Sequence, residues 1–147
     1  MPSNYFENYG VVTLTASATL TDEGYLGRRI ILHAAAGLTV TLPAATGSGN
    51  RYEFLVRTTV TSNSYIIRVA NSSDTMVGTA ILFADAGDTV VGFAASGTND
   101  TITMDGTTRG GIAGATVIVD DIATNLWNVR VLSDASGTEA TPFSATV

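Results

Sequence analysis

The sequence contains no cysteine and no lysine, and it has a single histidine and a single tryptophan. Without cysteine, disulfide bonds and thiolate chemistry are excluded. One imidazole with no thiolate is also a poor basis for a zinc site, whose usual ligands are histidine and cysteine. The seven basic residues are all arginines, against 13 acidic residues, and the net charge is −6 at pH 7. Nucleic acid is therefore not expected as a partner, because binding to phosphates requires clustered positive charge.

Charged residues are scarce as well, at 14% of the chain, whereas hydrophobic residues make up 45%. No stretch approaches the ~20 consecutive apolar residues that would cross a bilayer, so we expect no membrane partner. The apolar excess must then be buried in a core or between chains. A length of 147 residues predicts one domain that is large enough for a real core.

Alternation of apolar and polar residues is the strongest local pattern, and it is clearest over residues 38–56, LTVTLPAATGSGNRYEFLV. Two alternating segments flank a glycine-rich connection there, which predicts a half-buried β-hairpin. The same signals predict further strands separated by turn-forming residues, and the full set is 11–15, 28–34, 38–42, 52–58, 65–70, 80–83, 89–93, 101–104, 116–120 and 126–132. Many short strands of this kind predict an all-β, single-domain antiparallel β-sandwich or barrel, jelly-roll-like.

The two ends of the chain differ from the middle. Residues 1–10 are interpreted as an extended N-terminal arm whose aromatic residues Tyr5, Phe6 and Tyr9 dock either on the same chain or on a neighbour. Residues 11–132 form the predicted β-domain. Residues 133–147 lose the alternation and are interpreted either as a C-terminal strap or edge strand, with Phe143 as its large apolar residue, or as a disordered tail.

Candidate catalytic groups are few. His33 lies in an alternating apolar segment and is expected to be structural, and no Gly-x-Ser-x-Gly motif accompanies it. Two carboxylates could in principle hydrolyse a glycosidic bond, but most acidic residues lie in turns, where they cap backbone groups. The pairs considered are Asp22/Glu23, Asp85/Asp88, Asp100/Asp105 and Asp120/Asp121. We therefore expect no enzyme, no catalytic residues, no metal and no cofactor.

Three other motifs have structural and functional interpretations. The segment 47–51, GSGNR, lacks the Gly-Lys-Ser/Thr ending of a phosphate-binding loop and is expected to be a turn. Trp127 is expected to anchor the core, with a sugar-stacking platform as the alternative. Residues 39–56 and 101–119 resemble one another, which is either an internal duplication or chance similarity.

Several segments resemble virion proteins of tailed bacteriophages, particularly head decoration (cement) proteins and the β-rich domains of tail fibres. They are 38–56, 71–81 (NSSDTMVGTAI), 126–129 (LWNV), 137–138 (GT) and 142–144 (PFS), which together span roughly residues 28–147. No catalytic residue is carried over, because such proteins have none.

The resemblance implies a protein that is made in the host cytoplasm and resides on the capsid surface of the virion. It implies binding to the major capsid protein, commonly as a homotrimer, and stabilisation of the head by bridging neighbouring capsomers. Tyr5, Phe6, Tyr9 and Phe143 are the residues we expect to contact the partner. The alternative is a tail-fibre or receptor- or carbohydrate-binding domain.

Overall fold

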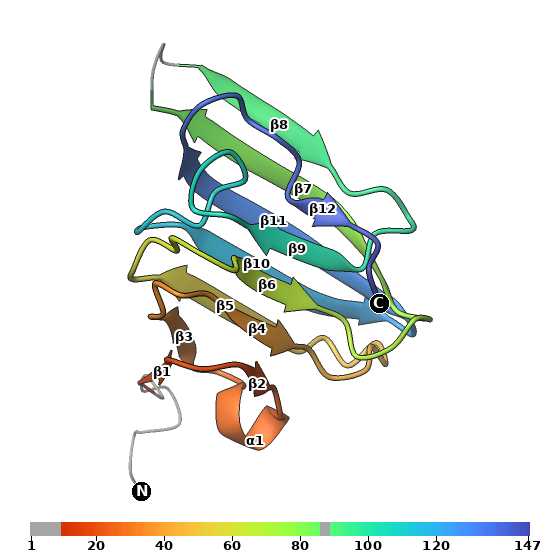
Figure 1. The fold of residues 1–147 in the computed structure, drawn as a ribbon. Helices are drawn as coiled ribbons and strands as arrows, with labels where there is room; N and C mark the ends of the chain where they lie inside the picture. Colours follow the sequence, from red (N-terminus) through yellow and green to blue (C-terminus); the bar gives the residue numbers. More distant parts are fainter. Residues whose placement is uncertain (1–9, 86–88) are drawn as a thin grey trace, which may run out of the picture.

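The computed structural model describes residues 10–85 and 89–147, which form a sandwich of two mixed β-sheets (Figure 1). Sheet A has seven strands in the order β1 (Val11–Leu14), β3 (Arg29–Leu32), β5 (Arg51–Val56), β10 (Thr116–Ala123), β11 (Leu126–Ala135), β7 (Thr75–Ala84) and β8 (Val90–Ala94). Sheet B has five strands in the order β12 (Phe143–Ser144), β9 (Thr101–Met104), β6 (Tyr65–Arg68), β4 (Leu38–Thr41) and β2 (Ala18–Thr19). The all-β, single-domain sandwich predicted from the sequence is confirmed.

The first seven strands alternate between the two sheets, which corrects the predicted hairpin over residues 38–56. Strand β4 lies in sheet B and β5 lies in sheet A. The nine residues between them give the chain enough length to cross the ~10 Å between packed sheets. Each strand then buries its apolar face against the opposite sheet, which a flat hairpin alone could not achieve.

Alternation between sheets also makes the sheets mixed rather than purely antiparallel. Strands β1, β3 and β5 run parallel in sheet A, and β2, β4 and β6 run parallel in sheet B. Strands β7 and β11 form a further parallel pair, while the remaining pairs are antiparallel. The two similar segments, 39–56 and 101–119, both pass from sheet B to sheet A. Their common origin stays a prediction.

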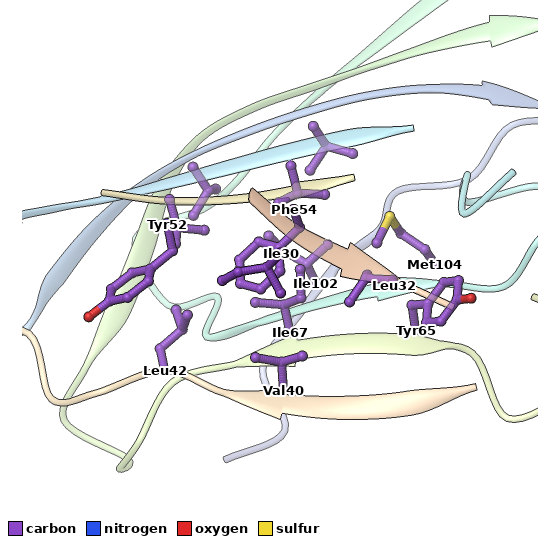
Figure 2. Packing of buried hydrophobic residues seen from close by; sticks show 14 of the residues in the cluster. Ile30, Leu32, Val40, Leu42, Tyr52, Phe54, Tyr65, Ile67, Ile102 and Met104 are labelled. Atoms are coloured by element: carbon purple, nitrogen blue, oxygen red, sulfur yellow. The ribbon is translucent and has the colours of Figure 1, made fainter. Parts of the chain in front are cut away.

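The core is formed by the inward-facing residues of both sheets (Figure 2). Its large aromatic residues are almost completely inaccessible, and Tyr65 also accepts a hydrogen bond from the Ala34 amide and donates one to the Thr58 carbonyl. Trp127 is 1% exposed and its ring centroid lies 6.2 Å from that of Tyr52. The interpretation of Trp127 as a core anchor is therefore confirmed, and burial of the ring rules out the stacking platform.

Among the described residues the helical content is a single turn, α1 (Asp22–Tyr25), where the Thr21 hydroxyl accepts a hydrogen bond from the Gly24 amide. No helix within residues 10–85 and 89–147 has the length and apolar character that a membrane span needs. Strand β12 forms the edge of sheet B by pairing with β9, so the C-terminal segment is attached to the sandwich.

Candidate interaction surface

The four residues predicted to contact a partner have different outcomes. Tyr5, Phe6 and Tyr9 lie outside the described residues. Phe143 is 6% exposed and belongs to the core cluster. Its side chain holds β12 against the sandwich, which leaves little of the ring for contact with another chain.

The outer face of sheet A carries large apolar side chains that solvent reaches. Along β7 and β11 the inward residues are buried, while every second residue points outward. Ile81 is 41% exposed, Phe83 40%, Leu132 47% and Val90 of β8 60%. Exposed apolar groups that lie singly are normal on proteins, but a contiguous group marks an interaction site.

Strand register brings these apolar residues side by side. Ile81 of β7 pairs with Leu132 of β11, and Phe83 pairs with Val90 of β8. A hollow of about 300 Å³ lies between β7, β11 and β10, lined by Thr79, Ile81, Thr116, Ile118, Arg130 and Leu132. A second hollow of about 320 Å³ lies over β7 and β8. We call the outward residues of β7, β8, β10 and β11 the apolar face.

Charged residues border the apolar side chains on β10 and β11 and continue across β5 and β3. Arg51 contacts Asp120 at 2.6 Å, and Arg130 contacts the same carboxylate at 3.8 Å. The hydrogen bond and the charge of Asp120 raise the pKa of Arg51. Farther along, Arg29 pairs with Glu53 at 2.6 Å. Because these pairs are at the surface, each contributes little to folding stability.

The glycine-rich loop at residues 46–49 binds a carboxylate of its own chain rather than a phosphate. Asp121 accepts hydrogen bonds from the amides of Thr46, Gly47 and Ser48, at 2.7 to 3.1 Å, and from both hydroxyls of this loop. Burial opposes ionisation of Asp121, but the hydrogen bonds from Ser48, Thr46 and Gly47 outweigh it and lower its pKa to about 2. The loop is therefore part of the irregular connection that crosses from sheet B to sheet A, not the turn that was predicted, and its hydrogen bonds to Asp121 fix it to β10.

A polar cavity of about 140 Å³ adjoins this loop. Asp22, Thr46, Tyr52, Asp121 and Trp127 are among its lining residues. The Tyr52 hydroxyl donates to the Asp22 carboxylate, and burial followed by this hydrogen bond raises the pKa of Tyr52. The Trp127 Nε1 group has no acceptor among the described residues. The structure thus places two of the predicted acidic residues in one cavity, but the oxygens of Asp121 are already occupied by the loop.

Two other carboxylates, those of Asp100 and Asp105, accept hydrogen bonds from backbone amides. Asp105 accepts from the Thr107 and Arg109 amides; burial works against ionisation of Asp105, and these bonds lower its pKa overall. Asp100 accepts from the Thr146 and Val147 amides and fixes the C-terminal segment. Asp85 is exposed and Asp88 lies outside the described residues.

His33 is partly buried, and its Nδ1 lies 2.5 Å from the Thr58 hydroxyl. This contact fits the structural role predicted for it. No group of three or more His, Cys, Asp or Glu side chains suitable for a metal ion occurs in the described part of the chain.

Sequence reasoning missed the apolar face, although one signal for it is present. In residues 80–83, AILF, the positions on both sides of the strand are apolar. Most other strands have threonine or a charged residue on one side. Continuous apolar runs are typical of strands covered on both sides. This run predicts the strand, and its apolar outer positions are the sign that the outer side of the strand also requires cover.

No family model, curated protein or solved structure matches this chain. The apolar face is therefore the best-supported candidate for a functional surface, on the basis of its own residues.

Proposed function

We propose that this protein is a structural virion component that decorates the head of a tailed bacteriophage and stabilises the shell by bridging neighbouring capsomers. The observation that carries the proposal is the apolar face, because a rigid sandwich with an uncovered sheet face is suited to assembly rather than to free diffusion. The low fraction of charged residues, 14%, supports the same role. So does the resemblance of residues 28–147 to decoration proteins.

In this role the protein binds the assembled shell and not its dissociated subunits. Such binding stabilises the shell by mass action, since a ligand of the assembled state shifts the equilibrium towards it. The proposed partner is the major capsid protein, and the protein also associates with itself, as the trimer that decoration proteins commonly form. Tyr5, Phe6 and Tyr9 are the proposed contacts to the capsid.

The test is co-sedimentation of the purified protein with expanded empty shells of its phage, compared with unexpanded shells. We expect saturable binding to expanded shells and a higher dissociation temperature of the decorated shells. A variant that lacks residues 1–9 should fold normally but bind more weakly. Absence of the protein from the shell pellet at every concentration would overturn the proposal.

The second candidate is a tail-fibre or receptor-binding domain that recognises a carbohydrate. It is favoured by the polar cavity, where Asp22 and Asn50 are among the lining residues and offer polar groups to a ligand. A glycan array distinguishes the two candidates. Glycan binding that is lost in Asp22→Ala, together with failure to bind shells, would support this second function instead.

A further inference from the structure

We propose that the apolar face binds the same face of a second copy of this chain, with the two copies related by a two-fold axis that crosses the strands. This inference rests on the proposed function, in which the protein associates with itself, and it adds a two-fold contact that is separate from the contact within a trimer. It is derived from the order of side chains along β11 and its neighbours.

The centre of the proposed interface is a row of uncharged residues that runs across four strands. Gly92 of β8 pairs with Ile81 of β7, Ile81 pairs with Leu132 of β11, and Leu132 pairs with Thr116 of β10. Ile81 and Leu132 are 41% and 47% exposed, so both have a large area to bury. Burying these side chains between two copies is favourable, because it removes apolar area from water.

The charges on either side of this row explain why a second copy is the occupant. Arg130 lies two residues before Leu132 on β11, and Asp134 lies two residues after it. Both residues are exposed. The Asp134 carboxylate has no partner among the described residues, and Arg130 makes only the 3.8 Å contact with Asp120. A face with a positive group on one side of an apolar row and a negative group on the other is complementary to itself in the reversed direction.

A two-fold axis across the strands produces this reversal. It places β11 over the partner's β11 in the opposite direction, with Leu132 on the axis. The same patch of both copies then forms the contact, which defines an isologous interface. Arg130 then faces the partner's Asp134, and Asp134 faces the partner's Arg130. On β7, the partner's Phe83 lies over Thr79, a residue that lines both hollows of the apolar face.

The available area is adequate for a stable pair. The strands β7, β8, β10 and β11 hold 33 residues, which at ~3.3 Å per residue and ~4.8 Å between strands cover about 520 Å², and the six residues of β5 bring this to about 620 Å². Specific interfaces bury ≈ 800 Å² from each partner. Sheets packed face to face at ~10 Å leave room for the Ile81, Phe83 and Leu132 side chains to interdigitate.

Sedimentation equilibrium tests the symmetry of the assembly. We expect a mass of two times 15.2 kDa, or of six times if the pairing joins two trimers. A wild-type protein that contains one or three copies at every concentration would contradict the two-fold pairing.

Charge reversal tests the geometry. In the Arg130→Glu variant, each introduced glutamate faces the partner's Asp134. In the Asp134→Arg variant, each introduced arginine faces the partner's Arg130. Like charges then meet twice in each pair, so we expect each variant alone to associate at least about tenfold more weakly. A mixture of the two variants restores both opposite-charge contacts in the mixed pair, and we expect it to recover the wild-type mass. Thermal unfolding of each variant confirms that it folds. Wild-type association of either variant, or no recovery in the mixture, would contradict the arrangement.

Cross-linking tests the position of the axis independently. The chain has no cysteine, so the substitution Leu132→Cys introduces the only thiol. We expect a short bifunctional maleimide to link the introduced thiols of two copies rapidly, whereas the control Thr39→Cys on sheet B links slowly. Equal yields would overturn the proposal. If the protein pairs but does not bind shells, the proposed function is wrong and the interface stands. If a strictly monomeric protein binds shells, the interface is wrong and the proposed function stands.

Discussion

The two outer faces of the sandwich are made by similar strands but carry different side chains. On sheet B the outward positions of β4 are Thr39 and Thr41, and Arg68 of β6 follows beside them. On sheet A the corresponding outward positions of β7 and β11 are Ile81, Phe83 and Leu132. Threonine and isoleucine are both β-branched and both suit strands. Folding alone therefore does not require the apolar choice, which indicates that the face of sheet A has a second task.

The shallow hollows on the two faces differ in the same way. The hollow on sheet B, of about 220 Å³, is lined by Ser17, Ala18, threonines and Arg68, whose polar groups water can satisfy. The hollows on sheet A are lined mainly by aliphatic groups. We interpret sheet B as the solvated side of the protein and sheet A as the side that another chain covers.

The largest effect is expected from breaking sheet A itself, at Gly78 in the middle of β7. Gly78 has φ of +131°, and a Cβ atom there would lie 1.9 Å from the Val129 carbonyl oxygen of β11. We expect Gly78→Ala to lower the free energy of unfolding by about 3 kcal/mol or more, measured by urea denaturation. The control is Gly92→Ala in the adjacent strand, where the nearest atom to a Cβ is 3.9 Å away. Equal stability of the two variants would contradict this account of the β7–β11 contact.

The next largest effect is expected from a substitution in the apolar face that leaves the fold intact. Leu132→Asp places a charge on the proposed axis, opposite its own symmetry mate, and such like-charge contacts cost several kcal/mol. We expect self-association to weaken at least about 100-fold in sedimentation equilibrium, with an unchanged thermal unfolding midpoint for the monomer. The matched control is Thr39→Asp on sheet B, which should leave association unaffected. If both variants associate equally well, the difference between the faces has no functional meaning.

A third prediction concerns Asp121, which lies outside the apolar face. Because its pKa in the folded protein is about 2, below the ordinary 3.8, its stabilising effect is complete above about pH 4 and is lost as the pH falls through 2. We expect Asp121→Asn to cost about 2 kcal/mol at neutral pH, since an amide group cannot accept all the hydrogen bonds of the loop.

Urea denaturation between about pH 2 and 7 measures this effect. The variant should show a flatter loss of stability with acid than the wild type, whereas Asp85→Asn, at an exposed carboxylate, should behave as wild type. Self-association at neutral pH should be the same in all three proteins. If the free energy of unfolding of Asp121→Asn falls with acid in the same way as that of the wild type, Asp121 is not the source of the acid dependence.

The smallest effect is expected when one face is made to resemble the other. Ile81→Thr keeps a β-branched residue but removes part of the apolar area, which should weaken pairing about tenfold and leave monomer stability nearly unchanged. The reciprocal change, Thr39→Ile, should not create a new specific complex, because sheet B lacks the opposed charges. A defined oligomer of Thr39→Ile in a light-scattering experiment would show that apolar area alone is sufficient.

Much of the fold was predictable, because strand formation depends on local alternation. The strand at Thr101–Met104 has the predicted bounds, and the other nine predicted strands are present with shifted ends. The assignment of strands to sheets was not predictable. The connection between β4 and β5 has turn-forming residues whether it closes a hairpin or crosses the sandwich, and its length permits both.

The candidate surface was harder to predict than the strands. Whether Ile81 and Leu132 point into the core or outward depends on the register of each strand. A shift of the register by one residue would turn every side chain of the strand to the other face. The contact of Asp121 with Thr46–Ser48 joins residues more than 70 positions apart, and no local signal indicates it. The prediction that acidic residues in turns accept from the backbone was confirmed locally for Asp105, whose carboxylate accepts from the Thr107 and Arg109 amides.

Hydroxyl-radical footprinting with mass spectrometry is the most direct test of whether sheet A is the covered face. The protein is labelled at concentrations below and above its self-association, and the oxidation of each residue is compared. We expect Ile81, Phe83 and Leu132 to lose reactivity on association, while Ile66 on sheet B and the exposed Leu26 keep theirs. Unchanged oxidation of Phe83 and Leu132 in the associated protein, or protection confined to Ile66, would contradict the assignment.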